Sequence, residues 1–409
     1  MNTNGEADSP RTVAFYLPQF HQITENDGWW GEGFTEWTNV RRARPQFTGH
    51  RQPRVPSELG YYDLTNVSVL EQQAILATAH GIDAFCFYHY WFSGRRLLEA
   101  PVSTFLSSVT DIGFCLCWAN ENWSRRWDGK SSDVLMAQGY EPGFARELFM
   151  SCLPSLLDGR YLRYKGAAVL IVHRADHLPS PIDAAAEWRS LARTTGVGAL
   201  HLLASETVWG TDPRTLGFDG VVEFPPVGAN GLSAAHLVPV RGLDPAFNGR
   251  ILSYNKLAAR FTSRRDAAFV RHRGVMPGWD NSARRGARAT IYVGSSPTAY
   301  ARWLRAARTS EFQSRGPDGL VFVNAWNEWA EGAYLEPDLD YGRAFLQASV
   351  HRSQLANDHM AQDRGRKRSR GWRPSIGFLR SIRNIAATST LMLMRRARTR
   401  VALNKKVRS

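Results

Sequence analysis

Two glutamates, three residues apart and flanked by tryptophans, are the residues of this sequence whose types and spacing best fit chemistry on a bound molecule. Glu328 and Glu331 follow the apolar run Leu320–Trp326, which is typical of a short buried β-strand. Cleavage of a sugar–sugar bond requires one carboxyl group that donates a proton and a second that acts as a base or nucleophile, and flat aromatic rings hold sugars. The pattern therefore predicts a carbohydrate-active enzyme with Glu328 and Glu331 as its catalytic residues. The alternative, a surface turn with two solvated glutamates, leaves the Trp on each side of Glu328 unexplained.

The elements that must position these glutamates are read from apolar runs that alternate with amphipathic stretches. The apolar runs predict strands at Val13–Leu17, Ile82–Tyr88, Phe114–Trp118, Ala168–His173, Leu200–Ser205, Gly220–Phe224, Gly274–Trp279 and Leu320–Trp326. The amphipathic stretches predict helices at Val69–Ala79, Phe144–Leu157, Asp183–Arg193, Leu257–Val270, Thr298–Thr309 and Arg343–Leu355. Eight strands that alternate with helices favour a (β/α)8 TIM-type barrel over an open sheet. The long connections Gln19–Asn66 and Pro225–Asn255 are expected to build loops on the catalytic face.

Polar side chains end almost every predicted strand. In barrel enzymes the chemistry lies at the carboxyl ends of the strands, so these side chains are expected to meet in one polar cleft. They are Gln19 and His21, His89 and Tyr90, Asn120 and Glu121, His173 and Arg174, Glu206, Glu223, Asp280, and Asn327 with the two glutamates. Helix caps or turns would explain one or two of these cases but not all of them.

Several motifs, in order along the chain, resemble a known family. Asn327–Gly332 is similar to the NEWxEG signature of glycoside hydrolase family 99, the endo-α-mannosidases. Phe15–His21, Gly33–Val40, Phe87–Phe92 and Cys117–Trp123 resemble still more closely the WbsX-type proteins of bacterial surface-polysaccharide gene clusters. The resemblance covers about residues 12–355. It implies a (β/α)8 barrel, in agreement with the strand count, and a retaining glycoside hydrolase of the endo-α-mannosidase type in the metabolism of an O-antigen-like or lipopolysaccharide-like glycan.

The resemblance also implies a division of roles. Glu328 then accepts the proton of the substrate's own 2-hydroxyl group, which attacks the anomeric carbon to give a 1,2-anhydro sugar. Glu331 matches the general acid that protonates the leaving oxygen and later activates water, with net retention. From chemistry alone the usual retaining route stays open, in which a carboxylate nucleophile lies about 5 Å from the acid. In either route Glu331 must hold its proton near neutral pH, and Glu328 with the rings of Trp326 and Trp329 is expected to raise its pKa.

The residues expected to bind the sugar combine hydrogen-bonding side chains with stacking rings. They are Tyr16, Gln19, His21, Glu36, Trp37, His89, Tyr90, Trp118, Asn120, Glu121, Trp123, Glu223, Trp326, Asn327 and Trp329. For His89 the alternative is a histidine satisfied in or near the core. Glu223 could be a carboxylate in the wall of the cleft or the structural partner of an arginine, and the sequence does not separate the two.

Two other classes of function stay open. A glycosyltransferase of polysaccharide assembly could hold Mg²⁺ or Mn²⁺ with Asp338 and Asp340, which fit an Asp-x-Asp pattern. The same two acids lie just before a predicted helix, where they would cap its N-terminus. The third class is a noncatalytic glycan-binding protein, against which the intact glutamate pair argues. We expect no metal and no organic cofactor, because the cysteines lack CxxC spacing and the sequence has neither a P-loop nor a dinucleotide-binding pattern.

The basic charge of the chain is confined to its C-terminal tail. Of the 51 Lys and Arg residues, 15 lie in residues 364–409, which contain no Asp or Glu, so residues 1–363 hold 36 basic and 37 acidic residues. This near-neutral body gives no indication of specific nucleic-acid binding. Residues 385–394 are apolar but too few to span a bilayer, and their basic flanks suit an interfacial helix on an anionic membrane surface. A disordered basic tail is the alternative.

Composition and patterning together suggest three parts. We expect a disordered N-terminus at residues 1–10, one catalytic domain at residues 11–357 and the basic tail at residues 358–409. The polar start lacks the apolar segment of a secretory signal, and no run of 18 apolar residues occurs. The four cysteines fit small buried hydrophobic residues in a reducing cytoplasm. These features predict a cytoplasmic protein, peripheral on the inner face of the cytoplasmic membrane if the tail binds there, with an oligo- or polysaccharide as its substrate.

Overall fold

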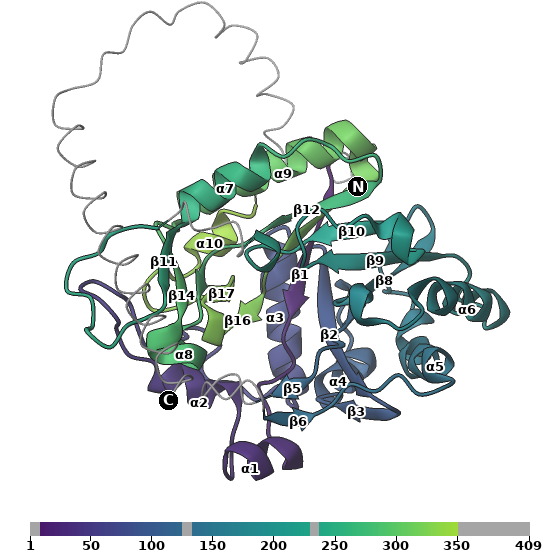
Figure 1. Cartoon of the computed structure of the whole chain (residues 1–409), viewed down its shortest axis with the longest axis horizontal. Helices are drawn as coiled ribbons and strands as arrows, with labels where there is room; N and C mark the ends of the chain where they lie inside the picture. The colour runs from purple at the N-terminus through teal and green to yellow at the C-terminus, as the bar shows by residue number, and fades with distance from the viewer. Residues whose placement is uncertain (1–8, 125–132, 230–236, 351–409) are drawn as a thin grey trace, which may run out of the picture. The chain divides into compact units, whose positions relative to one another are not determined.

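Eight parallel strands form a closed barrel in the computed structural model, which describes residues 9–124, 133–229 and 237–350 (Figure 1). In chain order the strands are β1 (Arg11–Tyr16), β2 (Ala84–Phe92), β4 (Gly113–Trp118), β8 (Ala167–Val172), β9 (Leu200–Glu206), β10 (Gly220–Glu223), β12 (Val270–Val275) and β15 (Leu320–Val323). Strand β1 pairs in parallel with both β2 and β15, and this closes the ring. The predicted TIM-type (β/α)8 barrel is therefore confirmed.

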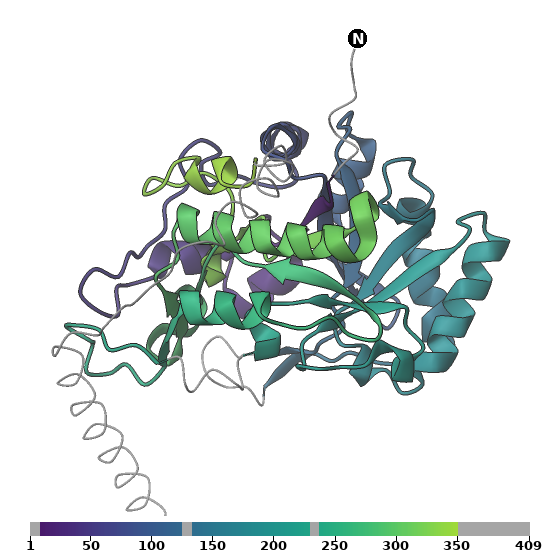
Figure 2. The same cartoon turned by 90° about the horizontal axis from the view of Figure 1, so that it is seen from above.

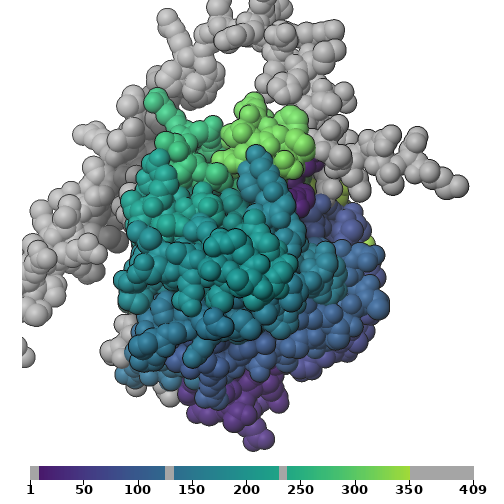
Figure 3. Space-filling model, turned by 90° about the vertical axis from the view of Figure 1, so that its right-hand side faces the viewer, coloured from purple at the N-terminus to yellow at the C-terminus, as the bar shows by residue number. Residues whose placement is uncertain are grey.

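Helices connect most of the strands and cover the outside of the barrel (Figures 1 and 2). They are α3 (Val67–Ala79), α4 (Ala100–Ser107), α5 (Phe144–Leu156), α6 (Pro181–Thr194), α7 (Tyr254–Thr262) and α9 (Pro297–Arg315). Each buries one side, as α6 does with Ala184, Trp188 and Leu191. In the fully described link between β9 and β10 the chain forms only the 3-10 turn η2 (Pro213–Leu216) in place of an α-helix. Figure 3 shows the side that carries α5 and α6, where side chains of the teal and blue segments pack into a continuous surface.

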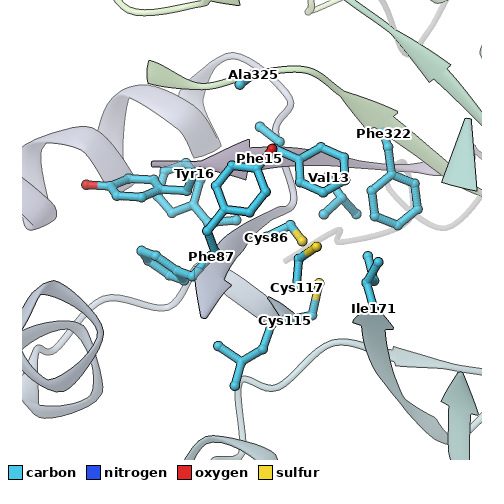
Figure 4. Close-up of a cluster of buried hydrophobic side chains, with 14 of the residues drawn as sticks. Val13, Phe15, Tyr16, Cys86, Phe87, Cys115, Cys117, Ile171, Phe322 and Ala325 are labelled. Atoms are coloured by element: carbon cyan, nitrogen blue, oxygen red, sulfur yellow. The ribbon is translucent and has the colours of Figure 1, made fainter. Parts of the chain in front are cut away.

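Apolar side chains fill the interior of the barrel. Val13, Phe15 and Phe322 from β1 and β15 lie beside Cys86 and Cys117 from β2 and β4 (Figure 4). All four cysteines of the chain are buried, as predicted, and are free thiols. Because side chains fill the middle of the barrel, open space for a ligand has to lie above them, among the loops at the carboxyl ends of the strands.

Those loops are long and carry their own small elements. The link after β1 contains α1 (Thr24–Trp30) and α2 (Glu36–Arg42). A second sheet is formed by β11 (Arg250–Ser253), β14 (Thr290–Val293) and β13 (Trp279–Asp280), and the short helix α8 (Ser282–Arg285) follows β13. After β15 comes the hairpin β16 (Asn327–Glu328) and β17 (Ala333–Tyr334). Helices α2 and α8 lie side by side next to this hairpin (Figure 1).

The prediction was wrong around the seventh strand. The helix predicted at Leu257–Val270 ends early, because α7 stops at Thr262. The strand predicted at Gly274–Trp279 is β12, which begins already at Val270. Three consecutive polar residues at 271–273 hid its pattern, since strands of a parallel barrel are normally apolar on both sides. Distant partners bind part of these polar groups, as Glu223 binds Arg273, and the sequence gives no local sign of them.

Several predictions concern residues outside the described ranges. The N-terminus at residues 1–8 and the basic tail from residue 351 onward fall there, so the disordered start and the interfacial helix stay predictions. The final helix predicted at Arg343–Leu355 is described only as the short α10 (Ala344–Gln347). None of the helices within the described ranges is both long enough and apolar enough to span a lipid bilayer.

Glu223, at the end of β10, is buried among arginines in the wall of the barrel. Its carboxylate accepts hydrogen bonds from Arg264 at 3.2 Å, from Arg273 at 3.3 Å and from the backbone N–H of Gly274 at 3.1 Å. Burial raises the pKa of Glu223, and the two arginines oppose that effect. Of the two readings left open by the sequence, the structure therefore places Glu223 as an arginine partner, and Arg273 is one of the polar residues that hid β12.

We expect Glu223→Gln to lower the free energy of unfolding by about 3 kcal/mol or more, because it leaves buried arginine charge without a full counter-ion. Urea unfolding followed by circular dichroism would measure this. The matched control is Glu147→Gln on α5, where the side chain is exposed and a change within about 0.5 kcal/mol is expected. Equal stabilities of the two variants would show that the Glu223 carboxylate does not hold this wall together.

Candidate active site

The turn that carries Glu328 and Glu331 is fixed to the neighbouring strand β1. Asn327 accepts a hydrogen bond from the backbone N–H of Leu17 at 2.7 Å and donates one to the Leu17 carbonyl at 3.0 Å. Gly332 ends the turn with a φ of 59°. A Cβ atom at this position would lie 2.9 Å from the Cβ atom of Asp280. Only glycine meets both the left-handed backbone and the close approach, so the two glutamates leave β15 in one defined geometry.

Trp329, between the two glutamates, anchors the turn inside the fold. Its indole N–H donates a hydrogen bond to Glu336 at 2.6 Å, and its ring stacks on Tyr334 with centroids 3.8 Å apart. Glu336 also accepts hydrogen bonds from Tyr62 at 2.8 Å and from Gln73 at 2.6 Å. Burial raises the pKa of Glu336 to about 7, and these donors act in the opposite direction. The acid nearest the turn in sequence is therefore a structural anchor with its hydrogen bonds already used.

A cavity of about 420 Å³ lies at the carboxyl ends of the strands and contains both glutamates. The rings that line it belong to Trp29, Trp30, Tyr88, Tyr90, Trp123, Phe224 and Trp279. Its polar lining includes Gln19, Asn26, Glu121, Asn122, His173, Asn281, Arg284 and Arg285. Ring faces beside a small number of hydrogen-bonding groups, in a cavity of this size, are suited to bind a sugar.

Six residues predicted from the sequence meet in this cavity, and His173 joins them from the list of polar strand ends. The six are Gln19, Tyr90, Glu121, Trp123, Glu328 and Glu331. Gln19 donates a hydrogen bond to the hydroxyl of Tyr90 at 3.0 Å. Residues within β2 and residues that follow β1, β4, β8, β10, β12 and β15 all contribute to the lining. The cavity thus gathers part of the polar strand ends that were expected to meet in one cleft, while others, among them His21, Arg174, Glu206 and Asp280, do not line it.

The structure places the other predicted binding residues behind the cavity wall. They are Tyr16, His21, Glu36, Trp37, His89, Trp118, Asn120, Glu223, Trp326, Asn327 and Trp329, all of them buried. Most have partners within the fold. Tyr16 donates to Gln73 at 2.6 Å, Trp37 to the Tyr62 carbonyl at 2.8 Å and Trp118 to the Trp91 carbonyl at 3.2 Å.

His89 and Asn120 show why a polar residue at a strand end need not face the ligand. The His89 Nε2 atom lies 2.9 Å from the Ser151 hydroxyl, and burial lowers the pKa of His89 to about 3, so the ring is neutral. Asn120 accepts a hydrogen bond from the backbone N–H of Arg174 at 2.7 Å and donates one to its carbonyl at 2.8 Å. Both side chains join neighbouring parts of the barrel. The reading of His89 as a histidine satisfied near the core fits this geometry.

Arg284 is the functional residue that sequence reasoning missed. Its guanidinium Nη1 lies 2.8 Å from Glu331 Oε1, and its Nη2 lies 3.1 Å from Glu328 Oε2. The same Nη2 lies 2.7 Å from Glu36 Oε2, and Nε lies 3.2 Å from that oxygen. One cation on α8 therefore contacts three carboxylates from two other loops. The only local signal was a cluster of arginines in a polar stretch, which usually indicates a solvated surface.

These contacts set the protonation of the glutamate pair. Burial raises the pKa of Glu328 to about 8 and also raises that of Glu331, in the direction expected from the sequence. Arg284 acts against burial, while the negative charge of Glu36 adds to it. Burial acts to lower the pKa of Arg284, but the carboxylates around it outweigh that and raise it, so the guanidinium stays charged. Near neutral pH the two glutamates therefore hold a proton between them.

The Asp-x-Asp pattern is divided between two environments. Asp338 is buried and accepts hydrogen bonds from the hydroxyl of Tyr334 at 2.6 Å and from the backbone N–H of Tyr341 at 2.5 Å. Asp340 is half-exposed and lies 3.9 Å from Arg51. Within residues 9–124, 133–229 and 237–350, no three or more His, Cys, Asp or Glu side chains are arranged to hold a metal ion.

Comparison with known proteins assigns the family. Residues 12–349 match the family described as "Glycosyltransferase WbsX". The chain belongs to the WbsX family. Two curated relatives, both called "Uncharacterized protein WxcX" and both from strains of Xanthomonas campestris pv. campestris, are 45% identical over 343 residues. The match covers 82% of this chain and 48% of each relative, so the chain spans about half the length of the curated relatives it matches.

Solved structures relate this WbsX protein to glycoside hydrolases in fold. A GH99 endo-α-mannosidase from Bacteroides thetaiotaomicron aligns with a TM-score of 0.53 and 15% identity over 87% of this chain and 98% of its own. A structure titled "Glycoside hydrolase-like protein" aligns with a TM-score of 0.54 and 14% identity over 85% of this chain and 94% of its own. At such identities the likeness shows the fold alone. Family and fold together give a carbohydrate-active enzyme fold related to that of the GH99 endo-α-mannosidases.

Replacing Arg284 by Met should raise the pKa values of Glu328 and Glu331 further, because the substitution removes the cation that opposes burial. A carboxyl group whose pKa is higher in the folded than in the unfolded protein binds more protons in the folded state. Its contribution to the free energy of unfolding is therefore lost as the pH rises through the pKa of the folded state. The loss of thermal stability in Arg284→Met should therefore be larger at about pH 9 than at about pH 5.

Differential scanning fluorimetry across this pH range would check the expectation. Arg146→Met, on the exposed side of α5, is the matched control and should follow the wild type at each pH. A stability loss in Arg284→Met that is the same at every pH would mean that Arg284 acts through packing and not through charge.

Proposed function

We propose that this WbsX protein is a retaining glycosidase of the endo-α-mannosidase type that acts on a bacterial surface polysaccharide. The observation that carries the proposal is that Glu328 and Glu331 reach one guanidinium, that of Arg284, inside a cavity lined by aromatic rings. Two carboxyl groups that hold a proton between them supply both partners of glycosidic cleavage, a proton donor and a base. The ring faces provide the surface on which a sugar stacks.

Exposure supports the division of roles between the two glutamates. The Glu331 side chain is 22% exposed and that of Glu328 is 8% exposed. The general acid must first meet the leaving oxygen and later a water molecule, so the more accessible Glu331 suits this role. The base acts only on a group of the sugar already seated in the cavity, for which the more enclosed Glu328 is sufficient.

In the proposed reaction each proton and bond is accounted for. Glu331 gives its proton to the glycosidic oxygen as the bond from C1 to that oxygen breaks. Glu328 takes the proton of the 2-hydroxyl group, and that oxygen bonds to C1 to form a 1,2-anhydro sugar. In the second half Glu331 takes a proton from water, the water oxygen attacks C1, and Glu328 returns its proton to the 2-oxygen as the three-membered ring opens. Two inversions at C1 give net retention. In the alternative route Glu328 bonds to C1 directly.

The second candidate function is glycosyl transfer from a nucleotide sugar, which the description of the family as a glycosyltransferase favours. That reaction would need a place for the diphosphate. The Asp-x-Asp pair offers little free capacity for it, because Asp338 already accepts two hydrogen bonds and Asp340 faces Arg51. A noncatalytic glycan-binding role is the third candidate, and the raised pKa values at the pair would then serve no purpose.

Glu331→Gln should reduce kcat on an oligosaccharide with an unactivated leaving group by about a thousandfold, which is typical for the loss of a general acid. On a glycosyl fluoride or a dinitrophenyl glycoside, whose leaving group needs no proton, the first step should be much less impaired. New reducing ends and their anomeric form, followed by NMR on α-mannosides and bacterial surface polysaccharides, would measure both effects.

Retention would appear as the α-anomer formed first from an α-linked substrate. An equal loss with both kinds of leaving group would remove Glu331 from the role of acid. Turnover of nucleotide sugars with Mn²⁺, together with no reducing ends from any glycan, would replace the proposed hydrolysis by transfer.

The pH dependence of kcat/KM should be bell-shaped, with an alkaline limb at about pH 8, because the proton shared by Glu328 and Glu331 is lost there and Glu331 then has no proton to give. Above this limb the pair holds no proton and lacks an acid. At low pH both glutamates are protonated and the base is lost. Rates measured on the free enzyme across the pH range would test this, and a rate that stays constant above pH 8 would contradict it.

A further inference from the structure

Glu36 is buried beside the proposed catalytic pair although it does not face the sugar cavity. It is the first residue of α2, its exposed fraction is 0%, and its backbone N–H donates to the Gln19 carbonyl at 3.2 Å. The Asn39 amide donates to Glu36 Oε1 at 2.7 Å. Thr35 and Thr38 cap α2 through reciprocal hydrogen bonds. The Glu36 carboxylate is therefore held in one position by its own helix.

The edge of the Arg284 guanidinium that Glu36 binds determines which N–H donors are left for Glu328 and Glu331. Glu36 takes the edge of the guanidinium formed by Nε and Nη2, with contacts of 3.2 and 2.7 Å. The remaining donors lie at the end formed by Nη1 and Nη2, and there Nη1 binds Glu331 while Nη2 binds Glu328. A guanidinium can also grip a single carboxylate with two parallel hydrogen bonds. Since Glu36 occupies one edge, the other end of the guanidinium spans both Glu328 and Glu331.

We propose that Glu36 is a positioning residue for the reaction: it orients Arg284 so that one cation bridges Glu328 and Glu331 and leaves a single proton to be shared by them. This inference rests on the proposed function of the pair. It gives Glu36 a part in the chemistry without contact with the sugar, which its burial behind the cavity requires.

Charge balance around the pair supports this role. Three carboxylates face one buried guanidinium, so the group is short of positive charge when all three are ionised. Arg285, from α8, lowers the pKa of Glu331, and the hydroxyls of Tyr88 and Tyr90, from β2, lie close enough to Glu328 for their own pKa values to be raised by it. Burial is the largest cause of the raised pKa values of Glu328 and Glu331, and Glu36 adds to it from outside the pair.

The test replaces Glu36 by Gln in the full chain and follows the carboxyl carbons of Glu328 and Glu331 by ¹³C NMR as a function of pH, with Glu328→Gln and Glu331→Gln for assignment. Loss of the Glu36 charge should lower the titration midpoint of the pair by about one pH unit or more. On a cleaved glycan, kcat should fall about 10- to 100-fold while KM stays within about twofold, because Glu36 does not touch the sugar. Glu36→Asp keeps the charge and should restore the midpoint.

Glu206→Gln is the matched control, since Glu206 is also buried and paired with an arginine, Arg264, in another part of the barrel. It should lower stability without moving the titration of Glu328 and Glu331. An unchanged midpoint in folded Glu36→Gln, or a midpoint shift of the same size in Glu206→Gln, would overturn the inference. The titration needs no turnover, so a shifted midpoint in a protein that cleaves no glycan would uphold the placement of Glu36 while rejecting the proposed function.

Discussion

The structure of this site depends on one buried guanidinium that faces three carboxylates. Removing carboxylates from water costs several kcal/mol each unless opposite charge and hydrogen bonds replace the solvent. Arg284 supplies one positive charge for Glu36, Glu328 and Glu331. Burial raises the pKa of Glu328 to about 8 even though an arginine lies 3.1 Å away, and the charges of Glu331 and Glu36 add to this effect, so the group keeps a proton. The proton that the proposed acid would donate is thus a result of burial and of the charge balance, and not of either glutamate alone.

This charge balance requires the loops that carry Glu36, Arg284 and the glutamate pair to be placed accurately. Many buried polar side chains of the barrel hold these loops in position. Asn327 ties the catalytic turn to β1 by two backbone contacts, and Glu336 ties the same turn to residues of the β1 loop and α3 through Tyr62 and Gln73. Gly332 lets the turn approach the strand that precedes α8. Residues that were predicted from the sequence to bind the sugar therefore often support the residues that line the cavity. This explains why so many buried polar groups lie just behind the cavity.

Structural features that depend on patterns of neighbouring residues were predicted correctly. Features that depend on pairs of residues far apart in the sequence were missed. The apolar runs gave the barrel, and the spacing of Glu328 and Glu331 between tryptophans gave the pair, because both signals lie within a few neighbouring residues. Arg284 meets Glu36 across 248 positions and Glu328 across 44, so no local pattern indicated its role. Strand β12 was misplaced for the same reason: Arg273 is tolerated in a barrel strand only because Glu223, 50 positions away, receives it.

The family is described as a glycosyltransferase, whereas the similar folds are those of glycoside hydrolases. The chemistry proposed for Glu328 and Glu331 can serve both reactions. A retaining site forms an activated sugar in its first half, and whatever hydroxyl group reaches C1 in the second half decides the product. Water gives hydrolysis, and a hydroxyl group of another glycan gives transfer, with the same two glutamates in the same roles. What distinguishes these outcomes is the part of the cavity that the departing sugar vacates, because the second nucleophile reaches C1 from that side. Aromatic rings in that part would exclude water and favour a second sugar. Seven aromatic rings line this cavity, so under the proposed mechanism an acceptor sugar would compete with water at Glu331. An assignment to hydrolysis or to transfer therefore depends on that half of the cavity and not on the catalytic carboxylates.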